Sequence, residues 1–196
     1  VDLLQTISMA SPTVLLGSST VPAAFTREVV EAMSASTERP LIFSLSNPTS
    51  RMEAMPYDVL AWSKGKALVT TGSPVAPVEY EGTFHKIGQA NNALVFPGIG
   101  LGVIVAGARH VTQRMLDAAA KAVAQQADPA HPGSALLPDI DNLAAISPLV
   151  AEAVYHAAVE DGVAAKTRDD VGQAILDIRW LPEYGQNEAY GVFGSE

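Results

Sequence analysis

Three short apolar runs divide the first part of the chain. They are Thr13–Leu16 (TVLL), Leu41–Leu45 (LIFSL) and Ala67–Thr70 (ALVT). None of them alternates between apolar and polar residues, and such continuous runs are typical of strands that are covered on both faces of a parallel sheet. We therefore predict three buried, parallel strands.

The segments between these runs carry the start and stop signals of helices. After the first run, Thr26 is a suitable N-cap, and Phe25 and Val30 have the spacing of a hydrophobic staple. After the second run, Pro56 suits the first position of a helix and Gly65 suits its end. The alternation of strand and helix predicts the βαβαβ half of a doubly wound, Rossmann-like α/β sheet flanked by helices.

The segment Ser50–Glu53 (SRME) also matches a capping box, which would start the second helix earlier. A helix begun there would hold Pro56 in its interior, where proline removes a backbone N–H and clashes with the preceding turn. We therefore predict that this helix starts one residue before Pro56.

The part of the chain beyond Asn92 is predicted to be mostly helical. One helix is indicated by an apolar stripe of Met115, Leu116, Ala119, Ala122 and Val123. Another is expected to have Ser147 as its cap and Pro148 as its first residue, and to end at Gly162. Between these helices, residues 128–142 hold three prolines and are predicted to form a loop.

The glycine-rich segment Ala93–Ala108 (ALVFPGIGLGVIVAGA) invites two functional interpretations, a membrane span and a phosphate-binding loop. Its 16 residues are fewer than the about 17–25 that span a bilayer. Gly98, Gly100 and Gly102 give G-x-G-x-G, and Val103 stands where the dinucleotide fingerprint needs its third glycine. We interpret the segment as a buried helix whose glycines allow close packing.

Composition narrows the class of protein. The chain has 196 residues, 48% of them hydrophobic and 17% charged, which predicts one folded domain with a sizeable core. The net charge of −9 argues against nucleic acid as a partner. The chain has no cysteine, which excludes disulfides, iron–sulfur clusters and a thiol nucleophile, and it has no recognisable signal peptide. We expect a cytoplasmic protein with no membrane partner.

The residues do not form a recognisable catalytic or metal-binding motif. The four histidines are scattered, and Asp139 and Asp141, two apart in the proline-rich loop, are interpreted as solvated. Ser18 and Ser19 follow a predicted strand, but the string LLGSST does not match the G-x-S-x-G nucleophile elbow. We assign no catalytic residue and no metal ligand.

Small polar residues follow each of the three predicted strands. These loops are Gly17–Thr20, Ser46–Thr49 and Gly72–Pro74, and Asn91–Asn92 form a further polar pair. Ligands of open parallel sheets bind beyond the carboxyl ends of the strands. Asparagine offers a donor and an acceptor without titrating. Small polar residues also occur in ordinary turns, so any one of these loops by itself does not indicate a site. Together, the loops favour a nucleotide-like ligand site.

Four strings resemble the malic enzyme family in order and spacing. They are RPLIFSLSNPTSRME, GKALVTTGSPVAPVEY, GQANNALVFPGIGLGVIVAGARHVT and LLPDIDNLAAISPLVAEAV. The resemblance runs from about Pro12 to Gly162, with a weaker echo at 180–184. It implies oxidation and decarboxylation of L-malate to pyruvate and CO₂ with NAD or NADP and with Mg²⁺ or Mn²⁺. It also implies that residues 93–96 begin a helical region.

The resemblance assigns roles to particular residues. It implies that Asn47 and Asn91 bind the substrate. It implies that the cofactor contacts are Ser18, Ser19, Ser46, Asn47, Gly72 and Asn92. Residues 1–196 would then be the C-terminal portion of one NAD(P)-binding domain. The family's G-x-G-x-x-G loop, catalytic residues and metal ligands would all lie upstream.

Two hypotheses about function remain open at this point. In the first, the chain positions cofactor and substrate in a malic enzyme whose full-length form is a dimer or tetramer, and the isolated chain is inactive. In the second, it is a stand-alone nucleotide-binding or assembly module without chemistry. An upstream G-x-G-x-x-G loop and acidic metal cluster would favour the first hypothesis.

Overall fold

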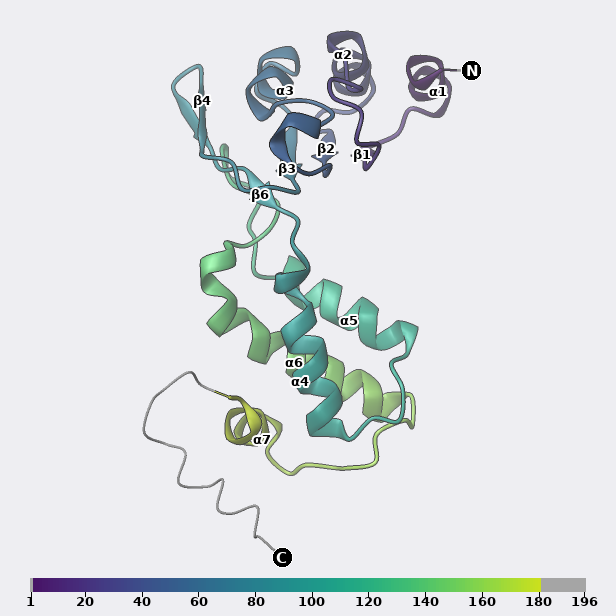
Figure 1. The fold of residues 1–196 in the computed structure, drawn as a ribbon, viewed down its shortest axis with the longest axis vertical. Coiled ribbons are helices and arrows are strands. Elements are labelled where there is room, and N and C mark those ends of the chain that lie inside the picture. The colour runs from purple at the N-terminus through teal and green to yellow at the C-terminus, as the bar shows by residue number, and fades with distance from the viewer. Residues whose placement is uncertain (1, 181–196) are drawn as a thin grey trace, which may run out of the picture.

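The computed structural model describes residues 2–180 (Figure 1). Its main sheet has four parallel strands in the order β1-β2-β3-β6. Their bounds are β1 (Val14–Gly17), β2 (Leu41–Ser44), β3 (Leu68–Thr71) and β6 (Gly88–Gln89). Figure 1 shows three helices side by side along this sheet, namely α1 (Leu3–Ala10), α2 (Arg27–Ser36) and α3 (Pro56–Trp62). The predicted Rossmann-like class is therefore confirmed, and each predicted strand lies within one residue of its observed place.

The prediction that all three strands are covered on both faces is wrong for β1. Leu15 and Gly17 face the core, whereas Val14 is 47% exposed and Leu16 is 59% exposed. The strand therefore alternates, and only one of its faces is covered within the described residues. The sequence could not reveal this, because both faces of β1 carry apolar side chains.

The start of each of the two predicted helices is confirmed. Thr26 caps α2 by accepting a hydrogen bond from the Val29 N–H, and Phe25 and Val30 are both buried. Helix α3 begins at Pro56 with Met55 as its N-cap. The capping-box string before it forms only a short 3₁₀ turn, η1 (Thr49–Arg51).

An antiparallel hairpin that the sequence analysis did not predict projects between β3 and β6. It consists of β4 (Val78–Tyr80) and β5 (Thr83–His85). Glu81 and Gly82 connect the strands with φ angles of 49° and 77°. Backbone angles of this kind suit a two-residue hairpin turn.

Residues 92–180 form a helical part with its own hydrophobic cluster, at the other end of the long axis in Figure 1. Its helices are α4 (Phe96–Ala106), α5 (Gln113–Ala124), α6 (Leu143–Glu160) and α7 (Val171–Ile178), with 3₁₀ turns η2 (Asn92–Leu94) and η3 (Ile140–Asn142). Four residues of the predicted stripe in α5 are buried, whereas Leu116 is 43% exposed.

Helix α6 starts earlier than predicted, and Pro148 lies inside it rather than at its first position. Asp139 caps η3 by accepting a hydrogen bond from the Asp141 N–H, and the chain passes directly from η3 into α6. Proline has no backbone N–H, so Pro148 leaves the carbonyl of Ala144 without its helical hydrogen bond. Ala144 is exposed, and water can therefore bond this carbonyl.

Helices α4 and α6 pack closely through two glycines of α4. A Cβ atom at Gly98 would lie 2.5 Å from the Val150 Cβ, and one at Gly102 would lie 2.6 Å from the Ala151 carbonyl oxygen. This contact confirms that the glycine-rich segment is a packing helix and not a phosphate loop. The segment Ile140–Glu160, which includes α6, is long and apolar enough to cross a membrane by length and composition alone, and α6 packs against α4, α5 and α7.

Candidate functional site

The strand register brings the predicted site loops to one edge of the sheet. Gly17 is level with Ser44, Ser44 with Thr71, and Thr71 with Gln89. The segments that follow these residues therefore leave the sheet at its carboxyl edge, where parallel sheets bind ligands. Asn47 follows β2 and Asn91 follows β6, with β3 between the two strands.

Asn47 is held against the loop that follows β3. Its Oδ1 accepts a hydrogen bond from the Ser73 Oγ, and the Asn47–Pro48 peptide bond is cis. A Cβ atom at Gly72 would lie 2.2 Å from the Leu45 carbonyl oxygen and 2.9 Å from the Asn47 Nδ2. Only glycine therefore allows these loops to approach one another as closely as they do.

Asn91 is fixed by its own turn. Its Oδ1 accepts a hydrogen bond of 2.9 Å from the Ala93 N–H and so caps η2. Asn92, the first residue of η2, is exposed. Gln89 ties this segment to its neighbour, because its Nε2 donates to the Gly72 carbonyl over 3.3 Å.

The two amides present the same chemistry. Both Asn47 and Asn91 are exposed, and in both the oxygen is already engaged. Within residues 2–180 neither Nδ2 has a hydrogen-bond partner, so each amide offers N–H donors. Neutral N–H donors at a sheet edge suit an acceptor such as a carboxylate or a carboxamide oxygen.

The serines of the site differ in exposure. Ser18 and Ser19 are exposed, whereas Ser46 is buried. Ser19 and Ser46 both donate hydrogen bonds to Glu53, which in the sequence stands out only as the last residue of the false capping box. The signal that could have found Glu53 is a carboxylate placed among the apolar residues of the string MEAM.

The environment of Glu53 keeps it ionised. Burial alone raises the pKa of the Glu53 carboxyl, but hydrogen bonds from Ser46 and from the Ser19 backbone and hydroxyl outweigh burial, so the pKa lies below its ordinary value. Glu53 therefore carries a negative charge at neutral pH.

Residues 2–180 contain no group of three or more His, Cys, Asp or Glu side chains that could hold a metal ion. Asp139, one of the two acidic residues of the proline-rich loop, is used as a turn cap. The predicted echo at 180–184 lies outside the described residues except for Trp180.

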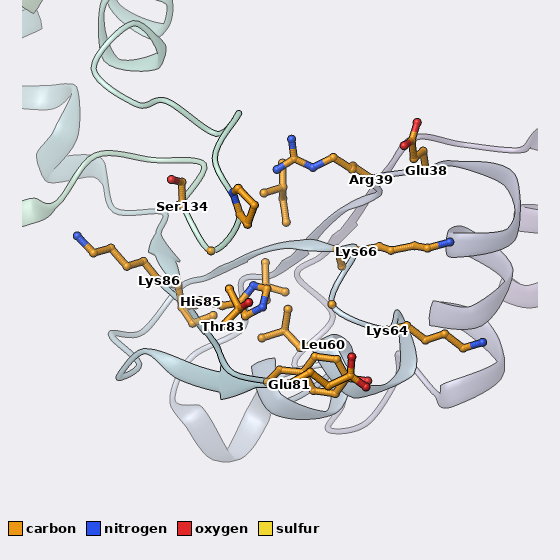
Figure 2. Close-up of a pocket in the computed structure, with 18 of the residues that line it drawn as sticks. Glu38, Arg39, Leu60, Lys64, Lys66, Glu81, Thr83, His85, Lys86 and Ser134 are labelled. Carbon is orange, nitrogen blue, oxygen red and sulfur yellow. The ribbon is translucent and has the colours of Figure 1, made fainter.

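Two cavities are lined in part by residues of the sheet part. The first has a volume of about 460 Å³ and is lined in part by Lys66 and Ala67, which precede β3 (Figure 2). In Figure 2 the Arg39 guanidinium and the His85 ring extend toward its middle, whereas the ammonium groups of Lys64, Lys66 and Lys86 point away from it. Burial lowers the pKa of His85, so this ring is neutral at pH 7. Six charged residues contribute to the lining, namely Glu38, Arg39, Lys64, Lys66, Glu81 and Lys86.

The second cavity, of about 950 Å³, lies between residues 74–77, the β5–β6 segment and the loop of residues 126–142. Neither cavity is lined by Asn47, Asn91 or Glu53. The first cavity is therefore distinct from the candidate site, whereas the second adjoins the carboxyl edge through Pro74 and Gln89.

Comparison with known proteins places this geometry in a family. A family described as "Malic enzyme, NAD binding domain" matches residues 1–159. Over 94% of its length the chain is 69% identical to the Mycobacterium tuberculosis protein named "Putative malate oxidoreductase (NAD)", and over 93% it is 46% identical to the malolactic enzyme of Lactococcus lactis. It covers 34% of each relative, so it spans about a third of their length.

A solved structure agrees with the sequence comparison. The crystal structure of the Entamoeba histolytica malic enzyme superposes with a TM-score of 0.71 at 29% identity, covering 90% of this chain and 32% of that one. The sheet and the helical part thus resemble a malic enzyme in three dimensions.

Proposed function

The chain belongs to the malic enzyme family, and from this premise we propose that it is the cofactor- and substrate-positioning part of an NAD-dependent malic enzyme that converts L-malate to pyruvate and CO₂. The observation that carries the proposal is the pair of amides at one sheet edge, Asn47 and Asn91, whose oxygens are engaged and whose N–H groups are available.

The donor set at the carboxyl edge fits the nicotinamide end of NAD. The exposed Ser18 hydroxyl and the amides of Asn47 and Asn92 supply neutral hydrogen-bonding groups for a carboxamide and a ribose. Gly98 and Gly102 of α4 pack against α6, so the glycine-rich segment does not serve the phosphates. We propose that the phosphate loop, and the ligands of Mg²⁺ or Mn²⁺, lie outside this chain.

When bound, NAD would supply the hydride acceptor for oxidation of malate at C2, and the resulting β-keto acid would lose CO₂ to give pyruvate. The proposed part of Asn47 and Asn91 is to donate hydrogen bonds to oxygens of malate and of the nicotinamide carboxamide. Because the amides do not titrate, they hold the reactants without taking part in proton transfer. Their contribution is orientation, which brings C2 to the nicotinamide face.

Kinetics of the full-length protein test these roles. We expect Asn47→Ala and Asn91→Ala each to lower the rate of malate-dependent NADH formation at least about tenfold, equivalent to about 1.4 kcal/mol. Asn142→Ala is the matched control, because Asn142 is an exposed asparagine that makes no side-chain cap at the start of α6. Wild-type rates in both Asn47 and Asn91 variants would contradict the proposal.

Similarity to a malolactic enzyme favours a second candidate, conversion of malate to lactate and CO₂. In that reaction the hydride taken from malate returns to the three-carbon keto acid, so no NADH accumulates. Measurement of pyruvate, lactate and NADH in one reaction separates the candidates, because one NADH per pyruvate supports the malic enzyme. NAD binding without turnover of malate would instead support a non-catalytic nucleotide-binding module.

A further inference from the structure

A fully buried carboxylate lies behind the candidate site. Glu53 has no exposed surface, and no other Asp, Glu, Lys or Arg side chain among residues 2–180 is buried. A buried charge is costly unless hydrogen bonds replace the water that it loses. The groups that donate hydrogen bonds to Glu53 therefore indicate its role.

Glu53 binds the two loops that form the cofactor side of the site. Its Oε1 accepts hydrogen bonds from the Ser19 N–H (2.8 Å), the Ser19 hydroxyl (2.9 Å) and the Ser46 hydroxyl (2.5 Å), and its Oε2 accepts one from the Ser46 N–H (3.4 Å). The Ser46 Oγ in turn accepts from the Thr20 N–H over 2.9 Å. One carboxylate thus joins the loop after β1 to the loop after β2.

Backbone hydrogen bonds from residues 23 and 25 fix the main chain at Met52 and Glu53. The Phe25 N–H donates to the Glu53 carbonyl over 3.0 Å, and the Ala23 N–H donates to the Met52 carbonyl over 3.2 Å. A Cβ atom at Gly17 would lie 2.6 Å from the Glu53 Cγ, so the side chain fills the space beside the end of β1. Because the carboxylate is enclosed, it acts on a ligand only through the loops that it holds.

Stability alone does not explain this charge, because well-packed apolar residues often stabilise a core as well as a buried ionic group does. Its four hydrogen bonds go to Ser19 and Ser46, which are the direct neighbours of the exposed Ser18 and Asn47. A shift of either loop would therefore move a group that faces the ligand.

We propose that Glu53 is a positioning residue that fixes the loops after β1 and β2 in the arrangement that receives the nicotinamide end of NAD. This inference rests on the proposed function for its ligand. The fixing of the loops is a property of the protein alone, and it can be measured without any ligand.

The test uses Glu53→Gln in the full-length protein. Glutamine keeps the length of the side chain but removes the charge and turns an amide N–H toward the Ser46 N–H. We expect the Kd of NAD, measured by calorimetry without malate, to rise about tenfold. We also expect faster hydrogen–deuterium exchange at the amides of Ser19, Thr20 and Ser46.

A matched control separates positioning from stability. Ser63 is equally buried in the sheet part, where its Oγ donates to the Leu60 carbonyl and accepts from the Ala67 N–H, away from the carboxyl edge. Ser63→Ala should lower the melting temperature without changing the Kd of NAD or exchange in the two loops. An unchanged Kd and unchanged loop exchange in Glu53→Gln would overturn the proposal.

Two further outcomes keep the result interpretable. If Glu53→Gln does not fold, Ser46→Ala removes the hydroxyl that links Glu53 to Thr20 and is expected to give the same changes more weakly. If the wild-type protein does not bind NAD, the proposed function fails, and loop exchange alone decides whether Glu53 fixes the loops.

Discussion

At the scale of single residues, surroundings decide what a side chain does. Asn47 and Asn91 were identified from the sequence because they stand in distinctive strings, and their roles remain predictions. The part played by Glu53 could not be predicted, because its partners Ser19 and Ser46 come together only when two strands pair. A glutamate in an exposed turn would be solvated and would not join two loops.

The lowered pKa of Glu53 predicts a particular acid sensitivity. A carboxylate whose pKa is lowered by folding stabilises the protein above its ordinary pKa of 4.5, and this contribution is lost as the pH falls through the folded value. Thermal unfolding followed from neutral to acidic pH should therefore show a smaller loss of stability below about pH 4.5 in Glu53→Gln than in the wild type.

A second carboxylate provides the comparison. A hydrogen bond from Thr112, followed by the hydrogen bond and charge of Arg114, lowers the pKa of Asp161 in the helical part. Asp161→Asn should also reduce the loss of stability at acidic pH. The reductions caused by Asp161→Asn and Glu53→Gln should add, because the two carboxylates share no hydrogen-bond partner. An acid dependence of Glu53→Gln equal to that of the wild type would contradict the charge assignment.

At the scale of elements, the sequence predicted best where a local signal agreed with the packing. Helices α2 and α3 begin at their expected caps. Helix α6 begins before its expected cap. Proline is typical of a helix start, but here Pro148 lies inside the helix, and the hydrogen bond that it cannot make is missing only at the carbonyl of the exposed Ala144. The hairpin of β4 and β5 was missed because its strands have only three residues each.

The glycines of α4 give a prediction with an internal control. Gly102→Ala would place a methyl group 2.6 Å from the Ala151 carbonyl oxygen and 2.8 Å from the Val154 Cβ, so we expect it to cost about 1–3 kcal/mol of unfolding free energy. Gly100→Ala meets no atom within 4 Å, so helix propensity should make it neutral or stabilising by up to about 1 kcal/mol. Urea unfolding of both variants measures the difference, and equal stabilities would refute close packing through Gly102.

At the scale of the whole molecule, the candidate site lies where the two parts of the chain meet. Asn47 lies in the loop that follows β2 of the sheet part, whereas Asn91 stands directly before η2, where the helical part begins. The loop between α5 and α6 returns to the sheet part, where the Arg39 guanidinium donates to the Pro129 carbonyl over 2.6 Å and the Lys86 N–H donates to the Gly133 carbonyl over 2.8 Å. These contacts fasten the loop between α5 and α6 to the sheet part.

This arrangement predicts how the isolated chain behaves toward NAD. Much of the recognition of a dinucleotide comes from a glycine-rich turn that places the pyrophosphate at a helix N-terminus, and residues 1–196 contain no G-x-G-x-x-G string. We therefore expect calorimetric titration of residues 1–196 with NAD to give weak or no binding, while the full-length protein binds. Circular dichroism of the same sample must first show a folded chain. Micromolar affinity of folded residues 1–196 would mean that the carboxyl edge alone holds the cofactor, and it would contradict the proposal that binding needs a phosphate loop outside this chain.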